Sequence, residues 1–396
     1  PALSRSPKGW LSSTDRPTKR RSDMDAVRLF RFADAAVGAL PEALGRAVFD
    51  AVGTVAGTLP SAGVRRLRAN QARIRPGMTP RQSRALARRA MRSYMRYYYE
   101  ALRLPRMSRE QIRARVRIDN SEWLREKFAE GQAAAAALMH SGNWDLAGAW
   151  AEIDLVHVHT LAEKLEPQEL YDFFVGYRTA VGMSVYPAGV GAIHRIEEAM
   201  REGACLAPIL ADRDLTASGV EVKFFGCAML VAAGPALLAQ RVGVPVYPVF
   251  SFYEKISGKR RRRAGTRWGM RLLVGEPVCA RTDASSPSDE RAADIARMSQ
   301  EWISQFEPWV SERLEDWHML QKVFVEDLDP ERLARTRRRA AEAVRAQPKD
   351  AKAFATGHEP PSEADNAPTA ARAFAEEKKT AATGAGDAVA ESEARL

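Results

Sequence analysis

Cysteine is scarce in this sequence, with only Cys205, Cys227 and Cys279 among 396 residues. Three is an odd number, and none of the three lies at the spacing of metal ligands. A disulfide framework and a zinc site are therefore both unexpected. His157 and His159 share one face of a predicted strand, but no third ligand stands at a suitable spacing. We expect no metal and a reducing, cytoplasmic environment.

Long apolar runs are also lacking. No stretch of eighteen uncharged apolar residues and no signal peptide is visible, which predicts a chain without a transmembrane helix. The sequence has no P-loop, no G-x-G-x-x-G after a strand and no G-x-S-x-G. Their absence argues against kinases, dinucleotide-dependent dehydrogenases and hydrolases with a serine nucleophile.

Negative charge is in deficit. Lys and Arg number 60 against 50 Asp and Glu, which gives a formal net charge of +10. Residues 346–396 hold six basic and nine acidic residues, so the preceding part carries +13, three more than the whole chain. Such a field attracts nucleic acid, an anionic membrane surface or phosphorylated substrates.

The N-terminal region changes character along its length. Residues 1–22 are rich in Pro, Ser, Lys and Arg, which predicts disorder. Residues 24–59 are more apolar and are divided by Pro41. In their second half, apolar residues recur at helical spacing and form one face: Leu44, Val48, Val52, Val55 and Leu59. This pattern fits equally well a helix packed on the core and a helix that dips into a membrane surface.

A stripe of arginines marks the segment 80–104, where Arg84, Arg88, Arg92 and Arg96 follow one another at four-residue intervals. Like charges at this spacing repel by a few tenths of a kcal/mol per pair unless an anion neutralises them. The stripe fits a solvated basic face or a surface apposed to anionic lipid. We favour the lipid surface, because the apolar segment just upstream can reach the same membrane.

Beyond residue 115 the pattern alternates between strands and helices. Short apolar runs predict strands at 116–118, 133–139, 156–161, 183–186, 204–210, 244–252 and 267–274, and helical patterns separate most of them. We expect an α/β fold with a mixed, mainly parallel central sheet flanked by helices, and a mobile basic loop at 259–263. The domain would span 23–325, with membrane-facing helices at 24–104, a helical extension at 326–346 and a disordered tail at 347–396.

One polar turn stands out. The apolar run 133–139 ends at His140, and a helical pattern opens at Trp144 after Ser-Gly-Asn. The carboxyl ends of strands are where open α/β folds hold ligands. Asp145 falls in the first helical turn, so its carboxylate can meet the imidazole across the turn. A histidine oriented by a carboxylate is a general base, and the backbone N–H groups of residues 142–144 are candidates for an oxyanion hole. A solvated histidine is the alternative.

A second polar block follows the predicted strand 204–210 and includes Arg213, Asp214 and Glu221. As a site, Arg213 can hold a phosphate or carboxylate, and Glu221 can bind a substrate hydroxyl or a histidine. A structural network of salt bridges is the alternative. Arg178, on a predicted helix after Glu163, offers a further cation for an anionic head group.

Several motif blocks together resemble the lipid A biosynthesis branch of the lysophospholipid acyltransferase superfamily. His140-Ser-Gly-Asn-Trp-Asp145 matches its H-x4-D/E signature. Further blocks resemble the actinobacterial phosphatidylinositol mannoside acyltransferases: Leu210-Ala-Asp-Arg-Asp214, Gly219-Val-Glu-Val222, Phe224-Phe-Gly226, Ala233-Gly-Pro-Ala236 and Trp317-His-Met-Leu-Gln321. The resemblance covers residues 24–325.

The resemblance implies an α/β fold with a deep acyl-chain tunnel, attached peripherally to the cytoplasmic face of the plasma membrane. It implies transfer of a palmitoyl-type chain from acyl-CoA, as co-substrate and without a cofactor, to the 6-hydroxyl of the inositol-2-linked mannose. By motif position His140 is the base, Asp145 its partner, and Glu163, Arg178 and Glu221 surround the head groups. Lipid A members of the branch often carry an uninterrupted N-terminal anchor, which this sequence lacks.

Two other functions fit the sequence. One is an acyltransferase that acts on another glycolipid or on a lysophospholipid. The other is a non-catalytic basic protein that binds a membrane or nucleic acid through its charge. The ordered motif blocks favour the enzyme, with an anionic membrane surface, acyl-CoA and a mannoside glycolipid as partners and without nucleic acid.

Overall fold

The computed structural model describes residues 15–119, 122–163, 167–189, 191–214 and 219–345. At its centre is a five-stranded sheet in the order β1-β9-β8-β2-β5. The strands are β1 (Val116–Ile118), β9 (Trp268–Val274), β8 (Val246–Lys255), β2 (Ala134–Leu138) and β5 (Leu206–Leu210). The strands β8, β2 and β5 are parallel, β1 is parallel to β9, and β8 is antiparallel to β9. The predicted α/β fold with a mixed, mainly parallel sheet is confirmed.

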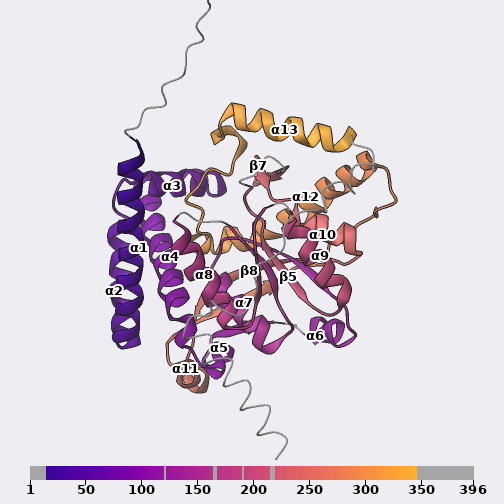
Figure 1. The fold of residues 1–396 in the computed structure, drawn as a ribbon. Helices are drawn as coiled ribbons and strands as arrows, with labels where there is room; N and C mark the ends of the chain where they lie inside the picture. Colours follow the sequence, from indigo (N-terminus) through magenta and orange to yellow (C-terminus); the bar gives the residue numbers. More distant parts are fainter. Residues whose placement is uncertain (1–14, 120–121, 164–166, 190, 215–218, 346–396) are drawn as a thin grey trace, which may run out of the picture.

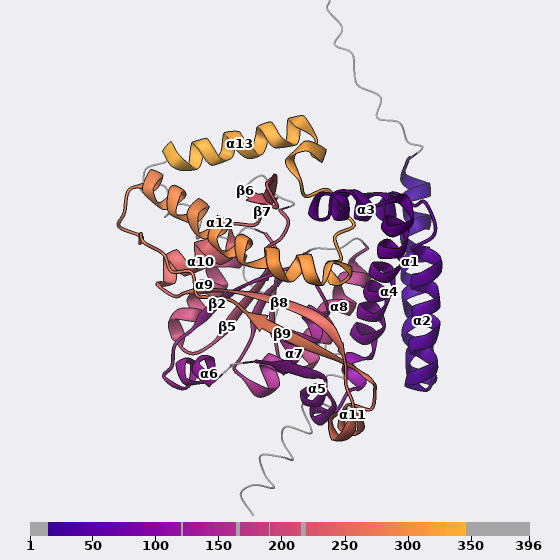
Figure 2. The ribbon, with the colours of Figure 1, turned by 180° about the vertical axis from the view of Figure 1, so that it is seen from behind.

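Helices cover both faces of this sheet (Figures 1 and 2). They include α5 (Arg109–Arg115), α6 (Glu122–Ala129), α7 (Trp144–Asp154), α9 (Ala192–Glu202), α10 (Gly234–Val242) and α12 (Ser288–Glu312). On the face seen in Figure 1, Trp150 of α7 is buried in one cluster with Met270 of β9. On the face seen in Figure 2, Trp302 of α12 is buried in another cluster with Phe250 of β8.

Strand β2 reads Ala-Ala-Ala-Ala-Leu, and its four alanines are at most 3% exposed. A strand inside a parallel sheet is covered on both faces and therefore reads as a continuous apolar run. Ala135 and Ala137 face the cluster around α12, whereas Ala134 packs with Phe128 of α6 on the other face. This composition makes β2 a buried central strand, and it ends two residues before His140.

Two pairs of strands extend the core. In the first pair, β3 (His159–Ala162) is parallel to β4 (Ser184–Pro187), helix α8 (Gln168–Ala180) joins them, and a bridge from Val158 to Leu206 places them beside β5. The second pair is a hairpin of β6 (Val220–Phe224) and β7 (Cys227–Val231). Its two turn residues have positive φ, 49° at Phe225 and 76° at Gly226, as a two-residue hairpin turn demands. This hairpin occupies a segment for which the sequence suggested a ligand-binding block or a network of salt bridges.

The N-terminal part of the described chain is helical, with α1 (Asp15–Ala39), α2 (Glu42–Ala56), α3 (Ala62–Ile74) and α4 (Pro80–Arg103) ahead of α5. Helices α1 and α2, in indigo, form one edge of the molecule, outside α4 (Figures 1 and 2). The α-helix begins at Asp15, so residues 15–22 correct the predicted disorder of residues 1–22, and residues 1–14 lie outside the described part. Pro41 separates α1 from α2, as predicted.

The apolar stripe of α2 is exposed. Within the described residues, the exposed large hydrophobic side chains all lie on α1, α2 and the residues just after them: Leu29, Phe32, Leu44, Val48, Val52, Val55 and Leu59. Of the two alternatives for this stripe, a helix face packed on the core is excluded for the monomer. The opposite side of α2 packs on α4 instead, through Gly45, Gly53 and Gly57.

The arginine stripe on α4 is divided. Arg84 and Arg88 are exposed, whereas Arg92 forms an ion pair with Asp50 of α2 at 2.5 Å. Arg96 is largely buried, with 11% of its side chain exposed, and its guanidinium lies 3.5 Å from the ring centroid of Trp268. The prediction of one continuous basic face is therefore wrong at Arg96.

The basic segment 259–263 is also different from the prediction. It forms α11 (Gly258–Ala264), which packs on α5, and is not a loop. Helix α13 (Pro330–Arg345) lies within the range expected for a helical extension and crosses above the β6–β7 hairpin (Figure 1). The tail predicted as disordered, 347–396, falls outside the described residues. None of the helices in the described ranges combines the length and apolar composition of a membrane span.

The close contact between α2 and α4 predicts a large cost for Gly53→Ala. A Cβ at this position would lie 2.7 Å from the Met91 carbonyl oxygen and 2.8 Å from Arg92 Cα, which are backbone atoms of α4. Overpacking of this kind costs about 1–3 kcal/mol, which urea denaturation can measure. As a control, Val52→Ala on the exposed side of α2 should change stability by about 0.5 kcal/mol or less. Equal stability of the two variants would contradict this packing.

Candidate active site

The carboxyl ends of β2 and β5 bring His140 and Asp212 together. These two strands are parallel, with Leu138 paired to Leu210. Because side chains alternate along a strand, the residues two places further on reach the same face side by side. The His140 Nδ1 atom lies 2.5 Å from Asp212 Oδ1, and the His140 backbone N–H donates to Asp212 Oδ2 at 3.0 Å.

Asp212 is held as a carboxylate. It is fully buried, and the Trp317 indole N–H donates to its Oδ2 at 2.8 Å. Burial by itself raises the pKa of Asp212, but the charge of the His140 imidazole and the hydrogen bonds from His140 and Trp317 outweigh it and leave the pKa below its usual value. An ionised Asp212 accepts a hydrogen bond from the Nδ1–H group of His140. It thereby selects the tautomer of His140 that leaves Nε2 unprotonated.

Asp145 has other partners. Its carboxylate accepts hydrogen bonds from the Tyr97 hydroxyl at 2.9 Å and from Arg178 Nε at 2.6 Å. The predicted contact between His140 and Asp145 is therefore wrong, because the His140 imidazole bonds Asp212 instead. Spacing along the chain favoured Asp145, but Asp212 at the end of the neighbouring strand β5 lies directly beside Nδ1 of His140. The hydrogen bond from Arg178 to Asp145 places the guanidinium beside this carboxylate.

Each residue of the turn after His140 has a structural role. Gly142 has φ +54°, and a Cβ there would lie 2.8 Å from backbone atoms of Ser251 on β8, so only glycine fits. The Asn143 side chain caps α7 by accepting from Leu146 N at 2.9 Å. The Gly142 N–H donates to the Asp316 carbonyl at 3.0 Å. This bond removes Gly142 from the predicted oxyanion donors.

Two buried carboxylates support the site from the N-terminal helices and from the segment after α12. Glu100 of α4 accepts from Asn143 Nδ2 at 3.1 Å and from Arg46 of α2 at 2.7 Å. Asp316 accepts from the Ser93 hydroxyl. Burial raises the pKa of Asp316 to about 6. Neither pairing could be predicted from sequence spacing, because the partners are more than forty residues away.

The segment around Trp317 completes the site. His318 N–H donates to the His140 carbonyl at 2.7 Å, and His318 Nε2 lies 3.0 Å from Ser93 Oγ. The Trp144 ring lies 4.0 Å from the ring of Tyr97 and 5.3 Å from that of His140, between centroids. The motif block that begins at Trp317 therefore holds His140 and its partner Asp212 in place.

The other predicted site residues are divided between two places. Glu163, after β3, accepts from Arg213 Nη2 at 2.7 Å. Arg213 follows Asp212, and its buried Nη1 atom has no hydrogen-bond partner. These two residues therefore lie at the same sheet edge as His140. Asp214 is next to residues 215–218, which lie outside the described part.

Glu221 lies elsewhere. It stands on the exposed side of β6, and Arg337 of α13 donates to its carboxylate at 3.1 Å. The proposal that Glu221 meets a histidine or a substrate hydroxyl at the site is corrected, because the β6–β7 hairpin turns its side chain toward α13. The two histidines considered for a metal have hydrogen-bonding partners as well. His157 pairs with Glu152 and His159 with Tyr186.

A narrow cavity of about 40 Å³ lies against Asp145 and Arg178, with Leu138, Met183 and Leu210 among its apolar walls. Ligand pockets usually measure roughly 300–1,000 Å³. In the arrangement of side chains described here, this cavity is too small to hold a long acyl chain.

Comparison with known proteins decides the family. Residues 26–326 match the family described as bacterial lipid A biosynthesis acyltransferase. The chain belongs to this acyltransferase family. A protein of Mycolicibacterium smegmatis named phosphatidylinositol mannoside acyltransferase is 36% identical over 304 residues, which are 76% of this chain and 91% of that protein. A protein of Mycobacterium tuberculosis with the same name is 33% identical over 313 residues, 77% of this chain and 90% of that protein. The resemblance predicted from the motif blocks is confirmed.

Buried His318 predicts a pH-dependent stability. Burial, followed by the charge of Arg96, lowers the pKa of His318 from 6.5 to about 3. Between these values the unfolded chain binds more protons than the folded one, so the free energy of unfolding should fall as pH decreases from 6.5 to 3. Asp316, with its raised pKa, contributes with the opposite sign. In urea denaturation at several pH values, His318→Gln should therefore show a shallower loss of stability.

His194→Gln is the matched control, since the side chain of His194 is 66% exposed. Its stability should follow the wild-type pH dependence. If His318→Gln also follows that dependence, His318 is not held neutral in the folded protein.

Proposed function

We propose that the chain transfers a palmitoyl-type acyl chain from acyl-CoA to the 6-hydroxyl of the inositol-2-linked mannose of phosphatidylinositol mannosides. The observation that carries this proposal is the 2.5 Å contact between His140 Nδ1 and Asp212 Oδ1 in the signature turn of an acyltransferase family. The names of the mycobacterial relatives support the mannoside acceptor.

In the proposed reaction, Nε2 of His140 removes the proton from the mannose hydroxyl while the oxygen attacks the thioester carbonyl. Asp212 stabilises the imidazolium that forms. The tetrahedral intermediate collapses, the carbon–sulfur bond breaks, and the protonated His140 returns its proton to the CoA thiolate. The products are the acylated mannoside and free CoA. The reaction needs no covalent enzyme intermediate.

The oxyanion of the intermediate needs hydrogen-bond donors. The backbone N–H groups of Asn143 and Trp144 stand at the start of α7, where a helix leaves its first donors without intrahelical acceptors. We propose these groups for the oxyanion, since the Gly142 N–H is already bonded.

Arginines at the same sheet edge suit the polar head groups. Arg213 has a buried Nη1 without a hydrogen-bond partner, and Arg178 lines the narrow cavity. A guanidinium offers several donors in a fixed plane for hydroxyl, phosphate or carboxylate oxygens. Asp145 holds Arg178 in place, and Glu163 holds Arg213. We therefore assign Asp145 and Glu163 to positioning these arginines around the substrates.

The substrate lipid also needs a membrane contact. We propose peripheral attachment to the cytoplasmic face of the plasma membrane through the exposed apolar stripe of α1 and α2. An amphipathic helix binds a bilayer by burying its apolar face among the head groups and acyl chains. The exposed Arg84 and Arg88 on α4 add attraction to anionic lipid.

The catalytic proposal predicts severe losses of activity for two variants. His140→Ala removes the base, which is typically worth about 10²–10⁴-fold in rate. Asp212→Asn should cost a similar factor, since the amide no longer fixes the tautomer or stabilises the imidazolium. Release of CoA from palmitoyl-CoA, followed with a thiol reagent in the presence of the mannoside, measures both. Wild-type rates in either folded variant would refute the assigned base or its partner.

His194→Ala removes an exposed histidine of α9 and should keep the wild-type rate. Asp145→Asn is expected to differ from Asp212→Asn in stability. It leaves the buried Arg178 without its carboxylate, and breaking a buried ion pair typically costs about 3–5 kcal/mol. Urea denaturation separates the two effects.

The acceptor is tested separately from the reaction. Purified protein, palmitoyl-CoA and a panel of phosphatidylinositol mannosides, lipid A-like glycolipids and lysophospholipids should yield an acylated mannoside, with the position mapped by fragmentation mass spectrometry. Acylation of another lipid alone would keep the enzyme class and replace the acceptor. No thioester cleavage with any acceptor would favour the non-catalytic alternative.

The membrane proposal predicts weaker liposome binding for the double variant Val48→Ser and Val52→Ser. Both valines are half exposed, and full burial of a valine side chain contributes about 1.5–3 kcal/mol. Co-sedimentation with vesicles that contain phosphatidylinositol should fall at least about tenfold, and wild-type binding should weaken as salt rises. The control adds two hydroxyls on α12 by Ala293→Ser and Ala296→Ser, which are exposed. Undiminished binding by the valine variant would exclude α2 as the contact.

A further inference from the structure

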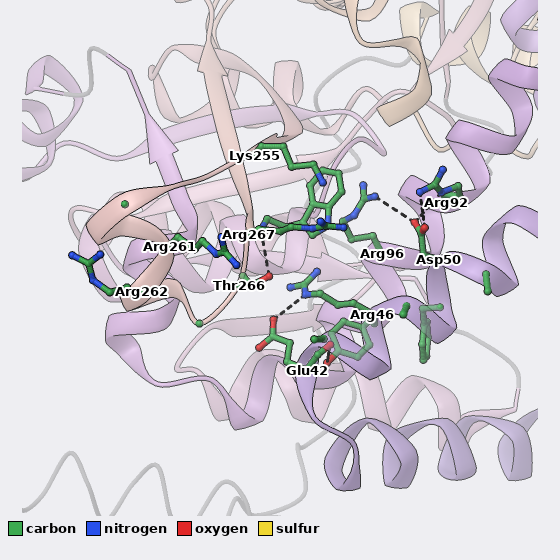
Figure 3. Close-up of a pocket in the computed structure, with 18 residues that line it drawn as sticks. Glu42, Arg46, Asp50, Arg92, Arg96, Lys255, Arg261, Arg262, Thr266 and Arg267 are labelled. Carbon is green, nitrogen blue, oxygen red and sulfur yellow. Dashed lines mark hydrogen bonds and ion pairs between the residues drawn. The ribbon is translucent and has the colours of Figure 1, made fainter.

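A wide pocket of about 1040 Å³ opens between α2, α4 and the connection from β8 through α11 to β9 (Figure 3). It is separate from the narrow cavity at Asp145 and shares no lining residue with it. Seven basic side chains line it against two acidic ones, Glu42 and Asp50. The basic residues are Arg46, Arg92, Arg96, Lys255, Arg261, Arg262 and Arg267. We call this the basic pocket.

The two carboxylates of the basic pocket are already paired. Glu42 accepts from Arg46 and from Arg115 of α5. Asp50 accepts from Arg92 and lies 3.7 Å from Arg96. The remaining four cations stand on β8, on α11 and just before β9, and form no ion pair with the described part of the chain: Lys255, Arg261, Arg262 and Arg267. An excess of positive charge is thus left facing the pocket.

Positive charge is crowded at one wall. The Lys255 ammonium and the Arg96 guanidinium lie 3.1 Å and 3.5 Å from the ring centroid of Trp268. Burial, followed by repulsion from Arg267 and Arg96, lowers the pKa of Lys255 to about 8. An anion bound beside these side chains would offset this repulsion.

Arg46 supplies an independent sign of a ligand. Only 10% of its side chain is exposed, and Glu42 and Glu100 fix its Nε and Nη2 atoms. Its Nη1 atom is buried and has no hydrogen-bond partner among the residues that the structure describes. A charged donor left in this state is costly, whereas an oxyanion in the basic pocket would satisfy it. Figure 3 shows the Arg46 side chain extending toward Thr266 across the pocket wall.

We propose that the basic pocket binds a phosphate ester group. Arginine forks and a lysine ammonium are the usual partners of phosphate oxygens. The pocket is also connected to the reacting turn. Glu100 bonds both Arg46 and Asn143, and Lys255 stands four residues along β8 from Ser251, which contacts Gly142. Four strand residues span about 13 Å, a separation that a phosphorylated substrate can bridge.

Two substrates of the proposed function carry such a group, and the assignment to either rests on that function. One source is the phosphodiester of the phosphatidylinositol acceptor, and the other is the phosphates of CoA. Binding of phosphate itself does not depend on acyl transfer, so the two proposals can fail separately.

The test compares the full chain with the double variant Lys255→Gln and Arg267→Gln. Isothermal titration with inorganic pyrophosphate should give saturable, salt-sensitive binding to the wild type and at least about tenfold weaker binding to the variant. The control, Arg335→Gln and Arg338→Gln, removes two exposed charges of α13, which lies at the opposite end of the molecule from α11 (Figure 1). The control should bind like the wild type.

Steady-state kinetics then identify the source. A rise in KM for palmitoyl-CoA alone assigns the basic pocket to the donor, and a rise in KM for the glycolipid alone assigns it to the acceptor. No pyrophosphate binding by the wild type, or equal affinity of wild type and double variant, overturns the proposal. Weakened pyrophosphate binding with both KM values unchanged overturns its assignment to a substrate. Intact pyrophosphate binding in a protein that never transfers an acyl chain retains the phosphate site and refutes the proposed function.

Discussion

The parallel pairing of β2 with β5 is the constraint on which the rest of the site depends. Because Leu138 faces Leu210 across this pair, both strands end at one level, and the residues that follow them emerge together. The alanines of β2 make the pairing possible, since they let helices close over both faces of the strand. A shift of one residue would turn either His140 or Asp212 away from the other. The geometry of the imidazole is thus a property of sheet register.

The histidine is then enclosed by segments distant in sequence. Ser141 bridges to Trp317 in antiparallel fashion, and the indole of Trp317 reaches Asp212. The segment after α12 therefore acts as a strap across the end of β2, with its backbone bonded to the His140 carbonyl. A site built in this way requires the whole domain to be folded, because no local piece of the chain contains both the imidazole and its supports.

Much of this architecture could be predicted from the sequence. Apolar runs separated by helical patterns were sufficient to predict the strands of the central sheet, β3, β4 and most of the helices, with the end of β2 placed one residue beyond Leu138. The hairpin β6–β7 was missed, because polar residues such as Glu221 and Lys223 alternate on its exposed side and resemble a loop. Asp212 could have been found by aligning the ends of two predicted parallel strands, but the order of strands in the sheet is not visible in one sequence.

The errors share one physical cause. Spacing along a chain predicts contacts within a helix or a turn, whereas the charges here are paired across elements. Arg96 stands in a row of arginines in sequence and yet lies against Trp268 of β9. Asp145 stands five residues from His140 and yet bonds Arg178 of α8. Tertiary packing decides these pairs, since a buried charge requires a partner from whichever element lies beside it.

Glu100 has a consequence for how this sequence can vary. Its buried carboxylate bonds Arg46 on an outer helix and Asn143 in the signature turn. Loss of Arg46 leaves the buried charge of Glu100 without its ion pair, loss of Asn143 removes one of its hydrogen bonds, and loss of Glu100 leaves the Arg46 Nη2 and Asn143 Nδ2 donors unpaired. A substitution at any one of the three positions therefore weakens contacts at the other two. A change on the outer helix α2 reaches the signature turn through Glu100, although the two lie far apart in the sequence.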